Sequence, residues 1–234
     1  TKTAYRELDI LMNQISVDES ESLGLKIDQL GELNCSRVGF TYPNNTTPSL
    51  IEFNASIRPG ERIAIMGRNA SGKTTLIKLL SGLLMPTQGV IAFDNLATSE
   101  IHPFVFHSKV SVVLQETNLF AGSIRDNILM GRDKIEESMI KNAMECSGVS
   151  SFISRIPGGL DGVIADRGLS LSTGQRQAIS IARALVINPE ILIMDEPTAS
   201  LDLNAEQAFV KHLNPFIKEK TMIVVTHRLP LLEL

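Results

Sequence analysis

The sequence has two cysteines, no apolar run long enough to span a bilayer and no run of basic residues. Cys35 and Cys146 lie far apart and match no metal spacing, so we expect two reduced thiols of a cytosolic protein. The longest apolar patches have the length of a strand, and the sequence predicts neither a signal peptide nor a membrane span. The formal net charge of −4, without a basic patch, argues against a nucleic-acid groove.

The N-terminal stretch, residues 1–32, differs from the rest of the chain. Leu8, Leu11 and Ile15 recur at helical spacing, and an acidic, serine-rich stretch follows at 18–22. This pattern predicts a helix followed by a linker, and a frayed tail is the open alternative. Because the chain begins with Thr1 rather than methionine, we expect a processed piece of a longer protein.

From about residue 34 the pattern indicates strands. Ile51, Phe53, Ala55 and Ile57 alternate with polar residues. Near-continuous apolar strands are expected at 62–66, 110–114, 191–194 and 222–225, as in a parallel sheet covered on both faces. Helices are expected at 73–84 and 174–185, and the stretch from about 123 to 187 is mostly helical. The sequence therefore predicts an α/β fold with an inserted helical subdomain.

A glycine-rich loop follows the strand expected at 62–66 and opens the helix that begins at Lys73. It reads Gly67-Arg68-Asn69-Ala70-Ser71-Gly72-Lys73-Thr74. Glycines let backbone N–H groups approach phosphate oxygens, and the helix N-terminus adds its positive dipole end. Lys73 would then contact the β- and γ-phosphates, and the Thr74 hydroxyl would bind Mg²⁺.

Two acids, Asp195 and Glu196, directly follow the apolar strand expected at 191–194. The carboxyl ends of parallel strands form the crevice in which α/β sheets bind ligands. Asp195 suits the coordination sphere of Mg²⁺. Glu196 can orient or deprotonate a water that attacks the γ-phosphate.

The segment Leu171-Ser172-Thr173-Gly174-Gln175 opens the helix expected at 174–185. Ser172 and Gln175 have the spacing of a capping box. Apolar residues bury one face of the helix, which leaves the Ser172 hydroxyl and the Gly174 N–H directed outward at an anion.

In this combination and order, the three motifs resemble those of the ATP-binding cassette (ABC) ATPase domains, over about residues 34–234. The resemblance implies a P-loop NTPase (RecA-like) core with a mostly parallel sheet, an antiparallel β part near the N-terminus and an inserted helical subdomain at about 118–187. It implies ATP and Mg²⁺ as cofactors. It implies that Tyr42 stacks on adenine, that Gln115 binds Mg²⁺ and senses a membrane domain, and that His227 contacts the γ-phosphate. A strand aromatic is the open alternative for Tyr42.

The site residues that the resemblance implies fall into three groups. The catalytic residues are Glu196, His227 and Lys73. The metal ligands are Thr74, Gln115 and Asp195. The nucleotide-binding residues are Tyr42, Gly67, Arg68, Asn69, Ala70, Ser71, Gly72, Lys73, Thr74, Thr75, Gln115, Ser172, Gly174 and Gln175.

The resemblance also implies a second copy as partner, because the family binds each ATP between the glycine-rich loop of one chain and the Ser172–Gln175 segment of the other. One position departs from the family pattern, since Thr173 stands where the usual segment has glycine. We expect Thr173 to leave ATP binding intact and to slow dimer closure or hydrolysis. Leu201-Asp202 fits the family's dimer-interface loop, although the preceding pair reads Ala199-Ser200.

Two further stretches resemble the exporters of this family: residues 118–128 and Asp166-Arg167-Gly168. Gly67-Arg68 and the ending His227-Arg228-Leu229-Pro230 favour type I secretion exporters of peptides or proteins. We therefore expect residues 1–32 to link a transmembrane domain to the ATPase domain at 33–234, on the cytoplasmic face of the inner membrane. The chain ends soon after His227, so we expect its C-terminal end to be truncated.

Two other functions are weighed against the exporter. A soluble ABC ATPase of DNA repair or translation would carry a coiled-coil insert or basic linkers, and the sequence has neither. A regulatory module without hydrolysis is favoured only by Thr173, while Glu196, His227 and Gln115 argue against it.

Overall fold

The computed structural model describes residues 29–132, 134–164, 168 and 170–234. The helix and linker expected within 1–28, and residues 166 and 167 of the exporter-type loop, lie outside the described residues.

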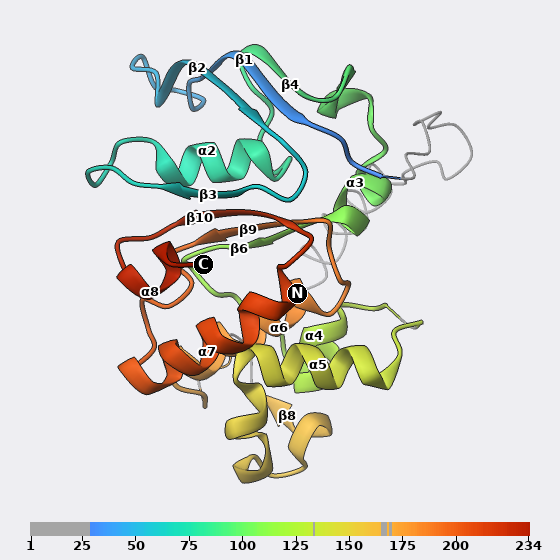
Figure 1. The fold of residues 1–234 in the computed structure, drawn as a ribbon. Coiled ribbons are helices and arrows are strands. Elements are labelled where there is room, and N and C mark those ends of the chain that lie inside the picture. Colours follow the sequence, from blue (N-terminus) through green and yellow to red (C-terminus); the bar gives the residue numbers. More distant parts are fainter. Residues whose placement is uncertain (1–28, 133, 165–167, 169) are drawn as a thin grey trace, which may run out of the picture.

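Two four-stranded sheets form the upper and middle layers of the molecule (Figure 1). The antiparallel sheet has the order β2-β1-β4-β5 and the parallel sheet the order β3-β10-β9-β6. The first is built from β1 (Leu33–Phe40), β2 (Leu50–Ile57), β4 (Gln88–Phe93) and β5 (Leu96–Ala97). The second is built from β3 (Arg62–Ile65), β6 (Val110–Val113), β9 (Ile191–Asp195) and β10 (Thr221–Val225). The α/β class with a parallel and an antiparallel part is confirmed.

Helices cover the parallel sheet on both faces, as its apolar strands require. Helix α2 (Lys73–Leu80) lies between the two sheets in Figure 1, and α3 (Pro103–Lys109) precedes β6. Below the parallel sheet lie α4 (Ile124–Leu129), α5 (Glu137–Ser147), α6 (Thr173–Leu185) and α7 (Leu203–Phe216), with α8 (Leu229–Leu232) near the C-terminus. A short ribbon of β7 (Gly122–Ser123) and β8 (Val163–Ile164), and single 3₁₀ turns at Val149–Ser151, Ile153–Arg155 and Gly159–Asp161, complete the helical part. Another such turn, Thr98–Glu100, follows β5.

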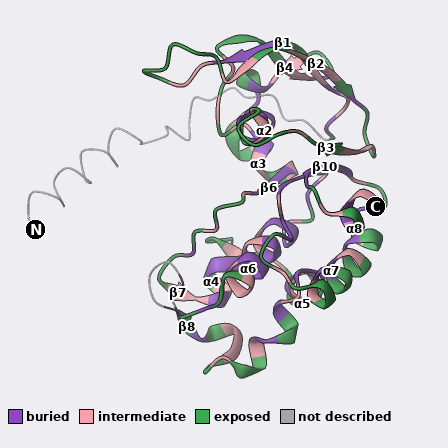
Figure 2. Ribbon diagram, turned by 90° about the vertical axis from the view of Figure 1, so that its left-hand side faces the viewer, coloured by how far each residue is buried: buried purple, intermediate pink, exposed green. Residues whose placement is uncertain are grey.

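The parallel sheet separates two hydrophobic cores. Along β9, Ile191 and Ile193 join the core around α2, while Leu192 and Met194 join the core against the helical layer. Successive side chains of a strand point to opposite faces, so one strand contributes to both cores. Figure 2 shows buried residues along α6 and exposed residues on the outer side of α7.

Two details of the predicted pattern are wrong. The helix expected at 73–84 ends at Leu80, because Gly82 turns the chain with a φ of 72°, and Leu83 is 48% exposed. Ile51, expected to face inward, is 70% exposed. Ile51 and Glu52 together lie opposite Gly39 in a β-bulge, and Glu52 has a φ of 45°, so the alternation slips at this point.

No helix within the described ranges has both the length and the apolar character needed to cross a membrane.

Candidate phosphate-binding and catalytic site

The glycine-rich loop connects β3 to the N-terminus of α2, where the sequence predicted it. Gly72 caps the helix with a φ of 88°, and a Cβ atom there would lie 2.5 Å from the carbonyl oxygen of Ser49. Only glycine fits such a backbone without strain. Lys73 Nζ donates 2.8 Å hydrogen bonds to the carbonyl oxygens of Gly67 and Arg68, so its charge lies over the loop. The loop therefore brings a cation and the start of a helix together, as anion binding requires.

Thr74, the residue after Lys73, contacts Asp195 at the end of β9. The Thr74 hydroxyl donates a 2.7 Å hydrogen bond to Asp195 Oδ2. The Asp195 side chain ends β9 and is buried, with 2% exposure. A hydroxyl and a carboxylate oxygen this close are hard donors of the kind that Mg²⁺ prefers, with further positions left to phosphate and water. No cluster of three or more His, Cys, Asp or Glu side chains suited to a metal occurs elsewhere in the described ranges.

Glu196 and His227 face each other across the ends of two neighbouring strands. His227 Nε2 lies 3.7 Å from Glu196 Oε1, after β10 and β9 respectively. The Glu196 N–H donates a 2.9 Å hydrogen bond to the Val225 carbonyl, and Glu196 has a φ of 48°. Glutamate rarely adopts this left-handed backbone, and strained residues of this kind cluster at active sites. The arrangement can hold a water between a carboxylate and an imidazole.

These residues line one cleft of about 890 Å³. Of the residues predicted for the nucleotide, the lining contains Asn69, Ala70, Ser71, Gly72, Lys73, Thr74, Thr75, Gln115, Asp195, Glu196 and His227. The structure thus gathers the loop, the two acids, the glutamine and the histidine at one place, although they lie far apart in the sequence. A cleft of this size suits a ligand with the dimensions of a nucleotide.

Tyr42 lies beside this cleft without lining it. Its ring meets the ring of Phe40 edge to face at 4.9 Å, and its hydroxyl lies 3.3 Å from Thr75 Oγ1. It packs half-buried against the core around α2. Both roles considered for Tyr42 are compatible with this position, and adenine stacking stays a prediction.

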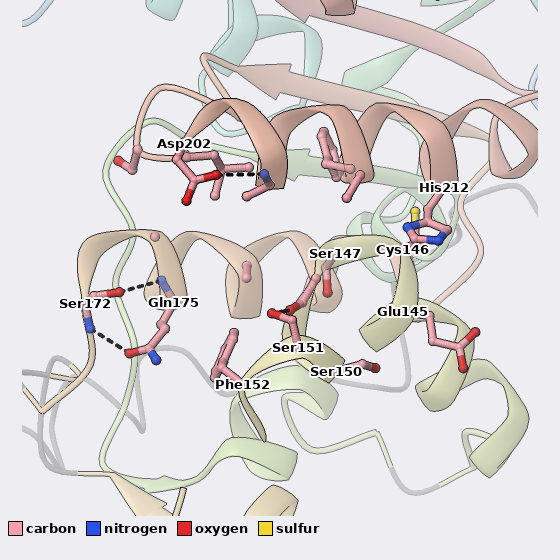
Figure 3. A pocket seen from close by; sticks show the side chains of 18 of the residues that line it. Glu145, Cys146, Ser147, Ser150, Ser151, Phe152, Ser172, Gln175, Asp202 and His212 are labelled. Carbon is pink, nitrogen blue, oxygen red and sulfur yellow. Dashed lines mark hydrogen bonds between the residues drawn. The ribbon is translucent and has the colours of Figure 1, made fainter. Parts of the chain in front are cut away.

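The Ser172–Gln175 segment lines a different cleft, of about 830 Å³ (Figure 3). The predicted capping box is present: the Ser172 N–H donates to Gln175 Oε1 at 2.9 Å, and the Gln175 N–H donates to Ser172 Oγ at 3.2 Å. Figure 3 shows these two residues at one end of the cleft and Cys146 and His212 at the other. No described residue lines both this cleft and the one at the glycine-rich loop. A single chain therefore leaves the two motifs apart.

Thr173 is held by a neighbour on its own helix. Arg176 Nη2 donates a 3.1 Å hydrogen bond to Thr173 Oγ1, and Arg176 Nη1 donates to the Leu171 carbonyl at 2.6 Å. The next residue, Gly174, packs closely against the following loop, because a Cβ atom there would lie 3.1 Å from the Ser200 carbonyl oxygen. Arg176 therefore holds the residues before Gly174, and the close approach of Ser200 restricts Gly174 itself.

A buried network that the sequence analysis missed connects the segments after Glu196 and after His227. The Thr198 hydroxyl donates to Glu206 Oε1 at 2.6 Å, and Arg228 Nη1 donates to Glu206 Oε2 at 3.2 Å. Arg228 Nη2 also donates to the Ala199 carbonyl. Glu206 shares the buried face of α7 with Phe209 and Leu213, and this helical spacing was the only signal in the sequence.

The comparisons with known proteins agree on one family. The model of the family described as ABC transporter matches residues 50–199. "ABC transporter B family member 21" of Arabidopsis thaliana is 32% identical over 97% of this chain and 18% of its own length. A probable multidrug resistance ABC transporter ATP-binding/permease protein of Bacillus subtilis is 34% identical, and an ATP-dependent lipid A-core flippase of Chromobacterium violaceum is 36% identical. Each covers 87% of this chain, which spans 35% of each.

A solved structure of a bacterial Atm1-family ABC exporter with ATP bound matches with a TM-score of 0.83 and 27% identity. The match covers 99% of this chain and 41% of that one. The chain spans between 18% and 35% of the length of the curated relatives named above.

Proposed function

The chain belongs to the ABC transporter family, and from this premise we propose that it is the ATP-binding and ATP-hydrolysing domain of an exporter. The observation that supports it best is the convergence of Lys73, the Thr74–Asp195 pair and the Glu196–His227 pair on one cleft. A phosphate-binding loop alone would serve binding, whereas these side chains also serve hydrolysis.

ATP and Mg²⁺ are the cofactors of this family, and when bound they supply the γ-phosphoryl group and the charge that neutralises it. Lys73 and the N-terminus of α2 bind the phosphates. Thr74 and Asp195 would hold the metal, with Gln115, two residues after β6, as a further ligand. Glu196 would accept a proton from the attacking water, and His227, with its Nε2 3.7 Å from Glu196 Oε1, would donate to or orient the same water from beside the carboxylate.

A second copy of the domain completes the site in this proposal. The cleft at the glycine-rich loop and the cleft at Ser172–Gln175 have no lining residue in common, and this separation supports a site shared between two chains. In a head-to-tail pair, the Ser172 hydroxyl, the Gly174 N–H and the dipole of α6 would meet the γ-phosphate bound by the partner. The pair would close on ATP and separate after hydrolysis.

The transport function is proposed from the relatives. Their names include a probable multidrug resistance ABC transporter, an ATP-dependent lipid A-core flippase and an Atm1-family ABC exporter. We propose that this domain works with a transmembrane domain at the cytoplasmic face of a membrane, with residues 1–32 as the link. Export of a peptide or protein, the type I secretion hypothesis, is supported only by the short stretches at 67–68 and 227–230.

The variant Glu196→Gln tests the ATPase and the dimer together. It keeps the shape of the side chain and removes the base, so we expect lost turnover and an ATP-stabilised dimer on size-exclusion chromatography. The matched control Glu219→Gln changes an exposed glutamate far from the cleft and should behave as the wild type. A Glu196→Gln protein that stays monomeric in ATP and Mg²⁺ while hydrolysing ATP normally would overturn the proposal.

A further inference from the structure

The side-chain amide of Gln177 is buried, and its nitrogen has no hydrogen-bond acceptor among the described residues. Gln177 lies on α6, with 3% of the residue exposed. Its Oε1 atom accepts a 2.6 Å hydrogen bond from the Thr117 hydroxyl. Turning the amide by 180° would leave the oxygen unmatched instead. Buried polar groups without partners are rare in folded proteins, so this one calls for an explanation.

The Thr117–Gln177 hydrogen bond joins two parts of the chain that serve different nucleotides in the proposed dimer. Thr117 follows Gln115 by two residues, and Gln115 lines the cleft at the chain's own glycine-rich loop. Gln177 lies on the helix whose capped end, Ser172–Gln175, faces the nucleotide of the partner. The two residues are 60 positions apart in the sequence.

A second contact ties the same two segments together. Arg183, also on α6, donates to the Asn118 carbonyl at 3.2 Å and to the Asn127 carbonyl at 2.8 Å. We treat the Arg183 contact as constant, because the guanidinium stays charged and keeps its donors whether or not a nucleotide is bound. Gln177, in contrast, has an unused donor, so its bonding can change when the 115–117 segment moves.

We propose that the Thr117–Gln177 contact couples the two ATP sites of the dimer, with Gln177 as the positioning residue; this rests on the proposed function. In this proposal Gln115, which is exposed and lines the cleft, turns toward a bound metal. When it turns, the backbone of residues 115–117 moves, and a carbonyl of this segment accepts a hydrogen bond from Gln177 Nε2. The new bond shifts α6 and its capped end, so filling one site prepares the other.

The test compares the Hill coefficient of ATP hydrolysis among matched variants. Gln177→Leu and Thr117→Val each remove the contact at nearly constant shape, and Thr117→Ser keeps the hydroxyl. Ser81→Ala is the control, because it removes a buried hydroxyl that donates within its own helix end, to the Lys78 carbonyl, and lines neither cleft. We expect positive cooperativity in the wild type, with a Hill coefficient approaching the limit of about 2 set by two sites.

Gln177→Leu and Thr117→Val should each lower the Hill coefficient to about 1, and the double variant should add nothing further, as expected for partners in one interaction. Thr117→Ser and Ser81→Ala should keep the wild-type value. Binding of the first ATP, measured with a fluorescent analogue, should change less than twofold, a small effect beside the lost cooperativity.

Three outcomes would overturn the inference. One is a lower melting temperature of both variants with an unchanged Hill coefficient, which is the result of a purely structural role. Another is a Hill coefficient of about 1 in a wild type that forms the ATP-stabilised dimer. The third is loss of cooperativity in Ser81→Ala as well. Failure of the proposed function is distinguishable, because the wild type would then show neither turnover nor an ATP-dependent dimer. If Gln177→Leu does not fold, Thr117→Val at its half-buried position decides the question alone.

Discussion

The Thr74 hydroxyl donates a 2.7 Å hydrogen bond to Asp195 across 121 positions of sequence. One residue begins a helix and the other ends a strand, so the bond fixes the phosphate loop relative to the parallel sheet. The same two oxygens are the metal ligands in the proposed function. Binding of the metal would replace this bond, and the loop would then be fixed to the sheet through the ion.

Thr74→Val tests that role at nearly constant volume. The variant loses one oxygen ligand, so we expect the apparent affinity for Mg²⁺ in ATP hydrolysis to fall on the order of 10- to 100-fold. Turnover measured over a range of Mg²⁺ concentrations gives the shift. Thr87→Val, which removes a hydroxyl bonded to the Gly39 carbonyl, is the control. An unchanged Mg²⁺ dependence in Thr74→Val would contradict the assignment.

Thr173→Gly restores the glycine usual in the family. We expect faster turnover with an unchanged KM for ATP, because the β-branched side chain would no longer stand where the two chains of the proposed pair meet. Thr173→Ser keeps the hydroxyl that accepts from Arg176 and removes only the methyl group. It should therefore show whether bulk or hydrogen bonding sets the rate. Turnover of Thr173→Gly within error of the wild type would show the idea to be wrong.

Arg228→Met removes the cation beside the buried Glu206 carboxylate. Because breaking a buried pair leaves an uncompensated charge, we expect the free energy of unfolding to fall by about 3 kcal/mol. Urea unfolding followed by circular dichroism measures it. Adding Glu206→Leu to the same chain should recover part of the loss, since no buried charge then remains. A loss in the double variant equal to the sum of the single losses would argue that the pair does not interact.

Both thiols should resist alkylation in the folded protein. Burial raises the pKa of Cys35 to about 11 and that of Cys146 to about 12. Only the thiolate reacts, and at pH 8 about one Cys146 thiol in 10⁴ is ionised. Iodoacetamide should therefore modify neither cysteine until denaturant exposes them, as read by mass spectrometry. Rapid labelling of the native protein would mean that the helical layer opens around Cys146 more often than its burial implies.

Features with local causes were predictable from the sequence. The glycine-rich loop, the capping box of Ser172 and Gln175 and the apolar strands each depend on neighbours within a few residues, and each lies where it was expected. The position of Asp195 and Glu196 followed from a general property of parallel sheets.

Features set by distant partners were not predictable. The bulge at Ile51 and Glu52 depends on its pairing with β1. Glu206 and Gln177 read as ordinary helix positions until Arg228 and Thr117 come beside them in the fold. Sequence spacing cannot indicate such contacts, because it contains no information about which segments meet.

Because β9 contributes to both cores, the positions of Asp195 and Glu196 are sensitive to insertions in this strand. One added residue before Leu192 would exchange the side chains that face each core, so both would be mispacked at once. The same shift would displace Asp195 from Thr74. Such a shift of register would impair folding as well as activity. The parallel sheet that orients the two acids also separates the two hydrophobic cores. The register of this five-residue strand therefore determines both the packing of the cores and the geometry of the site.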